Sequence, residues 1–180
     1  RDGTVTGVQT CALPISLVLV PMVADALSVP VIAAGGICDG RSMLAAMVLG
    51  AEGVQVGSRF VCSEESSAHP AFKQRVAEAD EGDTLLTLKE VAPVRLLRNP
   101  FFDQVKEAYT RGATAEELRS ILGRGRAKRG MFEGDLDEGE LEIGQVSGRF
   151  HEILPAARIV AEMLSEYEAA RARVSEIPCV

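Results

Sequence analysis

The hydrophobic pattern is most regular between Val29 and Val61, where two short apolar runs flank one amphipathic stretch. The first run, Pro30 to Ala34, lies between a valine-proline step and a glycine pair and predicts a fully buried strand. A helical pattern follows Asp39 and stops at Gly50, in the position that a left-handed C-cap requires. The second run, Gly53 to Val56, predicts another short strand. The expected apolar face of the helix consists of Met43, Leu44, Met47 and Val48.

A strand–helix–strand crossover this short predicts two parallel, neighbouring strands, each followed directly by a glycine turn. The turns contain Gly35-Gly36 and Gly57-Ser58. Parallel α/β folds place their ligands at the carboxyl ends of the strands, and glycine allows backbone N–H groups to approach an anion closely. The sequence therefore predicts a phosphate cradle made of two adjacent turns.

The run AAGGICDGRSMLAAMVLGAEGVQVGSRF resembles the C-terminal signature of the nitronate monooxygenase family, formerly called 2-nitropropane dioxygenases. This family includes the flavin-type enoyl-acyl-carrier-protein reductases. The resemblance implies an α/β fold, namely the C-terminal part of an FMN-binding TIM (β/α)8 barrel plus a small, mostly helical C-terminal domain. It also implies FMN as the cofactor, held by its phosphate. The FMN contacts implied by the motif are Gly36, Gln55, Val56, Gly57 and Ser58, with Gly35 adjoining.

The resemblance leaves two enzymatic reactions open. The first expectation is oxidation of alkyl nitronates through FMN with O2. The alternative is an NAD(P)H-dependent enoyl-acyl-carrier-protein reductase, because SSAHPAFKQ and GMFEGDLDEGELEIGQVSG look similar to the C-terminal domain of those enzymes. A hypothesis of another class is a non-catalytic phosphate- or nucleotide-binding barrel, related to enzymes such as IMP dehydrogenase.

The catalytic residue of the family is a histidine in a Gly-Gly-His segment that follows an upstream strand. This chain has no such segment, so neither His69 nor His151 inherits the role, and no catalytic residue is expected here. His69 is expected to be a loop or helix-start residue. Cys38, just beyond the glycine pair, is expected to be a buried packing residue rather than a flavin contact.

The first residues differ in character from the rest. Residues 1–16 show neither periodicity nor capping signals, and Val5 to Ser16 back-translates to a common sequencing-library adapter. We therefore expect a non-native leader, rather than a signal peptide, and a native sequence that starts inside a barrel. Strand edges and apolar faces should then be exposed. The expected parts are this leader, barrel elements with the FMN phosphate site (17–79), an extra domain (80–150), a terminal helix packing back on the barrel (151–174) and a tail (175–180).

Outside the signature, periodicity and capping residues predict further elements. Leu19 to Leu27 predicts a helix with Pro21 in its first turn, and a capping box of Thr114 and Glu117 predicts the start of another. The remaining expected elements are helices over 70–79, 101–109, 114–122 and 155–173, and short strands over 84–88 and 94–97. The apolar stripe expected on the last helix consists of Ile159, Val160, Met163, Leu164 and Tyr167.

Several polar motifs have both a functional and a structural interpretation. The basic cluster could hold a phosphate of a nicotinamide cofactor or of a carrier protein's prosthetic group, or it could be a solvated loop paired with the acidic run beside it. The basic cluster consists of Arg124, Arg126, Lys128 and Arg129. Arg95 and Asn99 are expected to be structural. Gly144-Gln145, with Gly148, could serve packing or a ligand. A calcium loop is excluded because Glu140 and Val146 stand where glycine and glutamate are required.

Composition narrows the class of protein. The chain has 180 residues, 47% of them hydrophobic, and a net charge of −7, which suits a globular domain and argues against nucleic-acid binding. No apolar run approaches the ~20 residues of a membrane span. The four cysteines have no metal-ligand spacing, so we expect no metal and a reduced, cytoplasmic setting. The expected partner is a small-molecule substrate, with a homodimer as an option. The cysteines are Cys11, Cys38, Cys62 and Cys179.

Overall fold

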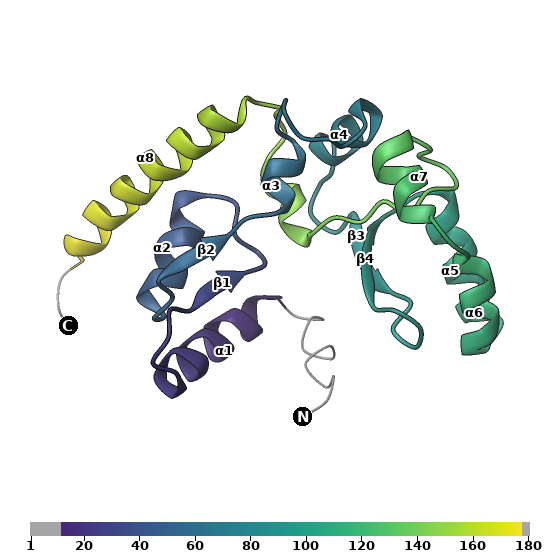
Figure 1. The fold of residues 1–180 in the computed structure, drawn as a ribbon, viewed down its shortest axis with the longest axis horizontal. Helices are drawn as coiled ribbons and strands as arrows, with labels where there is room; N and C mark the ends of the chain where they lie inside the picture. Colours follow the sequence, from purple (N-terminus) through teal and green to yellow (C-terminus); the bar gives the residue numbers. More distant parts are fainter. Residues whose placement is uncertain (1–11, 178–180) are drawn as a thin grey trace. The chain divides into compact units, whose positions relative to one another are not determined.

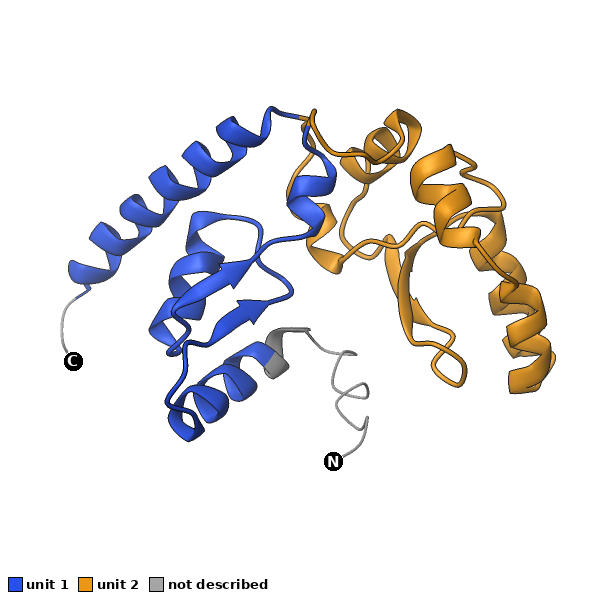
Figure 2. Ribbon diagram, in the orientation of Figure 1, with its two compact units in different colours: residues 1–63, 154–180 blue, residues 64–153 orange. Residues whose placement is uncertain are grey.

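The computed structural model describes residues 12–177, which form two compact units (Figure 2). Unit 1 contains the residues up to Ser63 and those from Leu154 onward, and unit 2 runs from Glu64 to Ile153. The boundary between the two units therefore lies at residue 64. The sequence predicts that the extra domain starts at residue 80. No helix within residues 12–177 is both long and apolar enough to cross a membrane.

Unit 1 contains a two-stranded parallel sheet flanked by helices (Figure 1). Ile32 lies opposite Gly53 and Ala34 lies opposite Gln55, so the two strands end side by side. The predicted parallel pair is thereby confirmed. The elements of unit 1 are α1 (Ala12–Ala26), β1 (Ile32–Ala34), α2 (Gly40–Val48), β2 (Gly53–Gln55), α3 (Ser58–Val61) and α8 (Ala156–Ser175).

The strands are less covered than the sequence predicts. Ala33 is buried, but Ile32 is 57% exposed and Ala34 is exposed as well. Within the described residues no third strand joins β1 or β2, so both outer edges of the pair lack a neighbouring strand. The prediction of a fully buried strand is wrong for this reason, and the expectation of exposed strand edges and apolar faces is confirmed.

The first two helices differ in detail from their predictions. Helix α1 begins at Ala12 instead of Leu19, which places Pro21 inside the helix rather than in its first turn. Helix α2 has the predicted limits, since Asp39 caps it and Gly50 follows it with a φ of +100°. Its apolar face is rotated from the prediction: Ala46 is buried and Val48 is 74% exposed. Val48 is therefore left largely in solvent, whereas the start of α2 meets α8 at Gly40.

Helix α8 packs on α2 at Gly40. A β-carbon at Gly40 would lie 2.1 Å from the backbone nitrogen of Tyr167 and 2.4 Å from the carbonyl oxygen of Met163. The Gly40 amide also donates a hydrogen bond to the Glu166 carboxylate at 2.9 Å. Only glycine permits this approach of the two backbones.

The predicted stripe of α8 is correct in part. Ile159 and Met163 are buried, whereas Val160 and Leu164 are about half exposed. The two helices approach closely at Gly40, where backbone atoms of α8 rather than large side chains face α2.

Unit 2 combines a hairpin with short helices. Strands β3 and β4 are antiparallel, with Thr84 opposite Leu97, and both were predicted. Thr114 and Glu117 form the predicted capping box. The elements are α4 (Pro70–Ala77), β3 (Thr84–Thr87), β4 (Val94–Leu97), α5 (Pro100–Thr110), α6 (Ala115–Leu122), α7 (Arg126–Glu133) and the 3-10 helix η2 (Gln145–Arg149). The core residues are Leu88, Leu96, Phe101, Phe102, Val105, Ala108 and Leu118.

The charged stretch after Gly123 is more ordered than the predicted loop. Helix α7 lies within it, bracketed by Gly125 and Gly134, which both have a φ of +78°. Downstream, the Leu97 amide donates to the Leu141 carbonyl at 3.0 Å, and the Ile143 amide donates to the Arg95 carbonyl at 3.2 Å. Leu141 and Ile143 are buried, so this alternating segment lies along β4 with its apolar positions toward the core.

Candidate functional site

The candidate site lies where β1 and β2 end. Because Ala34 is opposite Gln55, the turns that begin at Gly35 and Val56 leave the sheet from adjacent strands. The structure therefore brings the sequence-predicted site residues together at one edge of the sheet. These are Gly35, Gly36, Gln55, Val56, Gly57 and Ser58, which we call the glycine cradle.

The backbone of the cradle is open at its glycines. Gly35 and Gly36 have φ values of +99° and +73°, a region that side-chain-bearing residues rarely adopt. A β-carbon added at Gly35, Gly36 or Gly57 would meet no other atom within 4 Å. Close packing therefore does not explain these glycines. What they provide is backbone without side chains, which a phosphate group can approach.

Helix α3 begins directly after Gly57. The amides of Phe60 and Val61 donate to the Gly57 carbonyl at 2.9 and 3.2 Å, so the chain turns as soon as β2 ends. Ser58 is half-buried at the first helical position and carries a hydroxyl beside the turn, whereas Arg59 is buried. The short turn of helix holds the second half of the cradle in place.

The loop after Gly36 is fixed by the cap of α2. The Asp39 carboxylate accepts hydrogen bonds from the Ser42 amide at 2.8 Å and from its hydroxyl at 2.7 Å. The Ser42 hydroxyl is also within 3.2 Å of the Cys38 amide. Burial acts to raise the pKa of Asp39, but the bonds from Ser42 and Arg41 outweigh it and lower the pKa. An ionised Asp39 therefore anchors this side of the cradle at neutral pH. Cys38 is buried, as expected.

Both histidines have structural partners in unit 2. His69 is the N-cap of α4, and its Nδ1 accepts a hydrogen bond from the Ala71 amide at 3.2 Å. Its ring lies against Gly134, where an added β-carbon would be 2.2 Å from Nδ1. His151 Nδ1 lies 3.1 Å from the carbonyl oxygen of Ala77. The prediction that His69 starts a helix is confirmed.

The basic cluster is largely paired with the acidic run. Arg126 contacts Glu138 at 3.1 Å and lies over the ring of Phe101 at 4.4 Å. The other ion pairs are Lys128 with Glu133 at 2.9 Å and Arg129 with Asp135 at 2.5 Å. The geometry therefore favours the structural interpretation, with most of the cluster on a helix rather than on the predicted loop.

Arg95 and Asn99 also have the expected structural roles. Arg95 donates to the carbonyl oxygen of Thr84 at 2.9 Å, across the β3–β4 hairpin. Asn99 caps α5 and donates to the carbonyl oxygens of Leu136 and Gly139, each at 2.8 Å. Arg95 thus links the two strands of the hairpin, and Asn99 links the start of α5 to the loop that contains Leu136 and Gly139.

Gly148, in the glycine motif near η2, allows the backbone to pack closely against residues 80 and 81. A β-carbon there would lie 2.9 Å from backbone atoms of Asp80 and Glu81. Ser147 is fully buried, and its hydroxyl has no hydrogen-bond partner within the described residues.

Sequence reasoning missed a buried acidic residue in unit 2. Glu140 is 7% exposed, and burial, followed by the charge of Glu142, raises its pKa to about 7. Burial also raises the pKa of Glu142. The alternation of acidic and apolar residues in Glu140–Ile143 is the signal that could have predicted an extended, half-buried segment. Within the described residues, no group of three or more potential metal ligands occurs.

The class defined by this fold and site is an α/β protein with an open glycine cradle at the ends of two parallel strands. A family profile described as "Nitronate monooxygenase" matches residues 3–166, and the chain belongs to that family. The chain is 35% identical over 151 residues to a "Probable nitronate monooxygenase" of Bacillus subtilis (strain 168), covering 83% of this chain and 43% of the relative. A protein of the same description from Staphylococcus aureus (strain MSSA476) is 34% identical over 149 residues, or 82% of this chain and 41% of the relative.

Solved structures agree with this assignment. FabK from Thermotoga maritima has a TM-score of 0.82 and 38% identity, covering 89% of this chain and 51% of that one. A nitroalkane oxidase from Streptomyces ansochromogenes has a TM-score of 0.71 and 30% identity, covering 97% and 48%. The chain thus spans about two fifths of the curated relatives and about half of the solved structures.

Proposed function

We propose that this chain supplies the FMN phosphate site of a flavin-dependent oxidoreductase that oxidises alkyl nitronates with O2. The observation that carries the proposal is the pair of open glycine turns at adjacent strand ends, in a chain of the nitronate monooxygenase family. In the whole protein, unit 1 would form part of a (β/α)8 barrel and unit 2 the small C-terminal domain.

The residues of the cradle suit a phosphate group. Gly35, Gly36 and Gly57 leave their backbone accessible, because no atom occupies the space where a β-carbon would stand. Backbone N–H groups and the Ser58 hydroxyl would bind phosphate oxygens, while Gln55 and Val56 would line the turn beside them. Bound FMN would supply the redox chemistry. The contribution of this chain is binding and orientation, and we assign it no catalytic residue.

FMN binding can be tested with a charge placed in the cradle. Gly57→Asp adds a carboxylate where the backbone permits a side chain, since φ is −102° and the space is open. We expect it to weaken FMN binding by about tenfold or more through repulsion of the phosphate. Riboflavin, which lacks the phosphate, should bind equally to both proteins. Flavin fluorescence quenching, measured on the protein that carries this chain, reports both affinities.

Two controls make this test specific. Gly57→Ala adds bulk without charge and should weaken FMN binding less than Gly57→Asp does. An equal affinity of the unmodified protein for FMN and riboflavin would contradict a phosphate cradle. Absence of any flavin binding would overturn the proposal as a whole.

The alternative reaction is NAD(P)H-dependent enoyl-acyl-carrier-protein reduction. It is supported by the similarity of residues 66–74 and 130–148 to the C-terminal domain of those reductases, and both segments lie in unit 2. Anaerobic reduction of the bound flavin distinguishes the two reactions. Reduction by propionate 3-nitronate supports the first proposal, whereas fast reduction by NADPH and none by the nitronate supports the alternative.

A further inference from the structure

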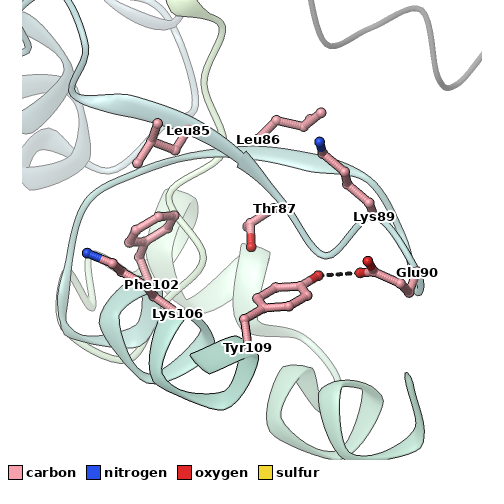
Figure 3. A pocket seen from close by; sticks show the side chains of 8 residues that line it. All are labelled: Leu85, Leu86, Thr87, Lys89, Glu90, Phe102, Lys106 and Tyr109. Carbon is pink, nitrogen blue, oxygen red and sulfur yellow. Dashed lines mark hydrogen bonds between the residues drawn. The ribbon is translucent and has the colours of Figure 1, made fainter. Parts of the chain in front are cut away.

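The surface hollow of unit 2 lacks the convergent polar groups that a small-molecule site needs. It has a volume of about 410 Å³ and lies between β3, the turn that follows it and α5 (Figure 3). Its two ammonium groups, those of Lys89 and Lys106, lie at opposite ends of the lining and point apart. Its carboxylate, that of Glu90, accepts a hydrogen bond from the Tyr109 hydroxyl at 2.5 Å. Polar groups converge instead in unit 1, on the loop that follows the first turn of the glycine cradle.

Three successive backbone amides of that loop donate hydrogen bonds to side chains. The amides of Cys38 and Asp39 both donate to the hydroxyl oxygen of Ser42, each at 3.2 Å. The amide of Gly40 donates to the carboxylate of Glu166, a residue of α8, at 2.9 Å. Each bond fixes the direction of one peptide group, so together they hold a continuous piece of backbone beside the cradle.

The hydroxyl of Ser42 uses its full hydrogen-bonding capacity in this loop. A hydroxyl has one proton to donate and two lone pairs that accept. Ser42 accepts from the two amides and donates its proton to Asp39, whose carbonyl oxygen lies at 2.9 Å and whose carboxylate oxygen lies at 2.7 Å. Removal of this one oxygen atom therefore removes all of these bonds at once.

The first turn of the cradle depends on what lies on either side of it. Gly35 and Gly36 are exposed, and glycine restricts the backbone less than any other residue does. Strand β1 precedes the turn, and Ile37 and Cys38 follow it with 7% and 8% exposure. Ile37 belongs to the buried cluster around Ala33. The conformation of the open turn is therefore set by these neighbours, and the bonds of Ser42 and Glu166 lie on the side where the sheet has ended.

We propose that Ser42 and Glu166 are positioning residues for the FMN phosphate, which hold the segment after Gly35-Gly36 in the conformation that binds the phosphate. Glu166 lies in α8, so the last helix of the chain contributes to a site that β1 and β2 build. This inference rests on the proposed function and adds to it that the affinity for the phosphate depends on hydrogen bonds made outside the cradle.

Substitution of Ser42 tests the proposal through the difference between FMN and riboflavin. Ser42→Ala should weaken FMN binding about three- to tenfold, because the phosphate must then order the turn itself. Riboflavin, which lacks the phosphate, should bind equally to both proteins. Ser42→Thr keeps the hydroxyl and should recover most of the FMN affinity. Flavin fluorescence quenching measures both ligands on the protein that carries this chain, and a loss of folded protein would affect both alike, so the ratio of the two affinities reports positioning.

Two variants of equal charge test Glu166. Glu166→Gln keeps a side-chain oxygen that can accept from the Gly40 amide, whereas Glu166→Ala does not. Both remove the negative charge, so the difference between them reports the hydrogen bond alone. We expect Glu166→Ala to bind FMN about two- to fivefold more weakly than Glu166→Gln, and both to bind riboflavin equally. Equal FMN affinities of the two variants would overturn the role of Glu166.

The capping box of α6 in unit 2 provides the matched control. Thr114→Ala removes a hydroxyl that accepts from the Glu117 amide at 3.3 Å, so it should destabilise a helix start without changing the ratio of FMN to riboflavin affinity. If the unmodified protein prefers FMN and Ser42→Ala keeps the same ratio, the positioning role is wrong while the phosphate site stands. If the unmodified protein shows no preference for FMN, the phosphate site itself is wrong, and the positioning role fails with it.

Discussion

Units 1 and 2 differ in how completely they bury their apolar residues. In unit 2 the core residues from Leu88 to Leu118 are at most 5% exposed, and most are fully buried. In unit 1 the buried cluster around Ala33 is smaller, and large apolar side chains stay in water on α1, β1 and α2. The glycine cradle belongs to the less covered unit. The larger buried core and the glycine cradle therefore lie in different units.

The largest expected effect comes from the core of unit 2. Phe101→Ala removes a fully buried ring and should lower the free energy of unfolding of unit 2 by about 3–5 kcal/mol. Ile32→Ala is the matched change in unit 1, and it should lower the stability by less than about 1 kcal/mol because Ile32 is already exposed. Hydrogen exchange followed by mass spectrometry reports each unit separately.

The comparison between the units would fail in one clear case. If Ile32→Ala accelerated exchange in unit 1 as strongly as Phe101→Ala does in unit 2, β1 would be covered in solution. The apolar residues of unit 1 would then not be more exposed than those of unit 2 in solution.

The sequence predicts the turns and helix caps of this protein better than it predicts which residues are buried. The parallel strands, the glycine turns and the caps at Asp39 and Thr114 follow from local signals, because turns and caps depend on a few neighbouring residues. The burial of β1 does not follow from local signals, because the exposure of Ile32 depends on whether another strand lies beside it. The cradle was predicted because it consists of consecutive residues on adjacent strands.

Contacts between distant residues account for most of the rest. Helix α7 looked like a loop because its glycines and charges suggest solvent, yet Gly139 and Glu140 pack against Gly130. Similarly, no signal in the residues around Gly40 indicates that α8 lies against it.

An intermediate effect is expected at the contact between α2 and α8. Gly40→Ala forces a β-carbon into backbone atoms of α8 at 2.1–2.5 Å and should lower the stability of unit 1 by about 1–3 kcal/mol or more. Gly57→Ala is the control in the same unit, since its β-carbon meets open space and should change the stability little. Urea unfolding followed by circular dichroism measures both, and equal stabilities of the two variants would contradict the close packing at Gly40.

The smallest effect concerns the buried carboxyl group of Glu140, and it should depend on pH. Its pKa is raised to about 7, so the neutral form stabilises the folded state below about pH 4.5, and this contribution is lost as the pH rises through 7. Glu140→Gln should therefore raise the stability of unit 2 at pH 8 by on the order of 1–2 kcal/mol, with little change at pH 4.5.

The matched control for Glu140 is Glu116→Gln on the exposed face of α6, which should change nothing at either pH. Urea unfolding at both values, with hydrogen exchange to locate the change, measures the difference. A Glu140→Gln protein no more stable than the unmodified one at pH 8 would show that water or a partner already solvates this carboxylate. Water would then reach unit 2 around Glu140. The difference in burial between the two units would then be limited to the core cluster around Phe101 and Phe102.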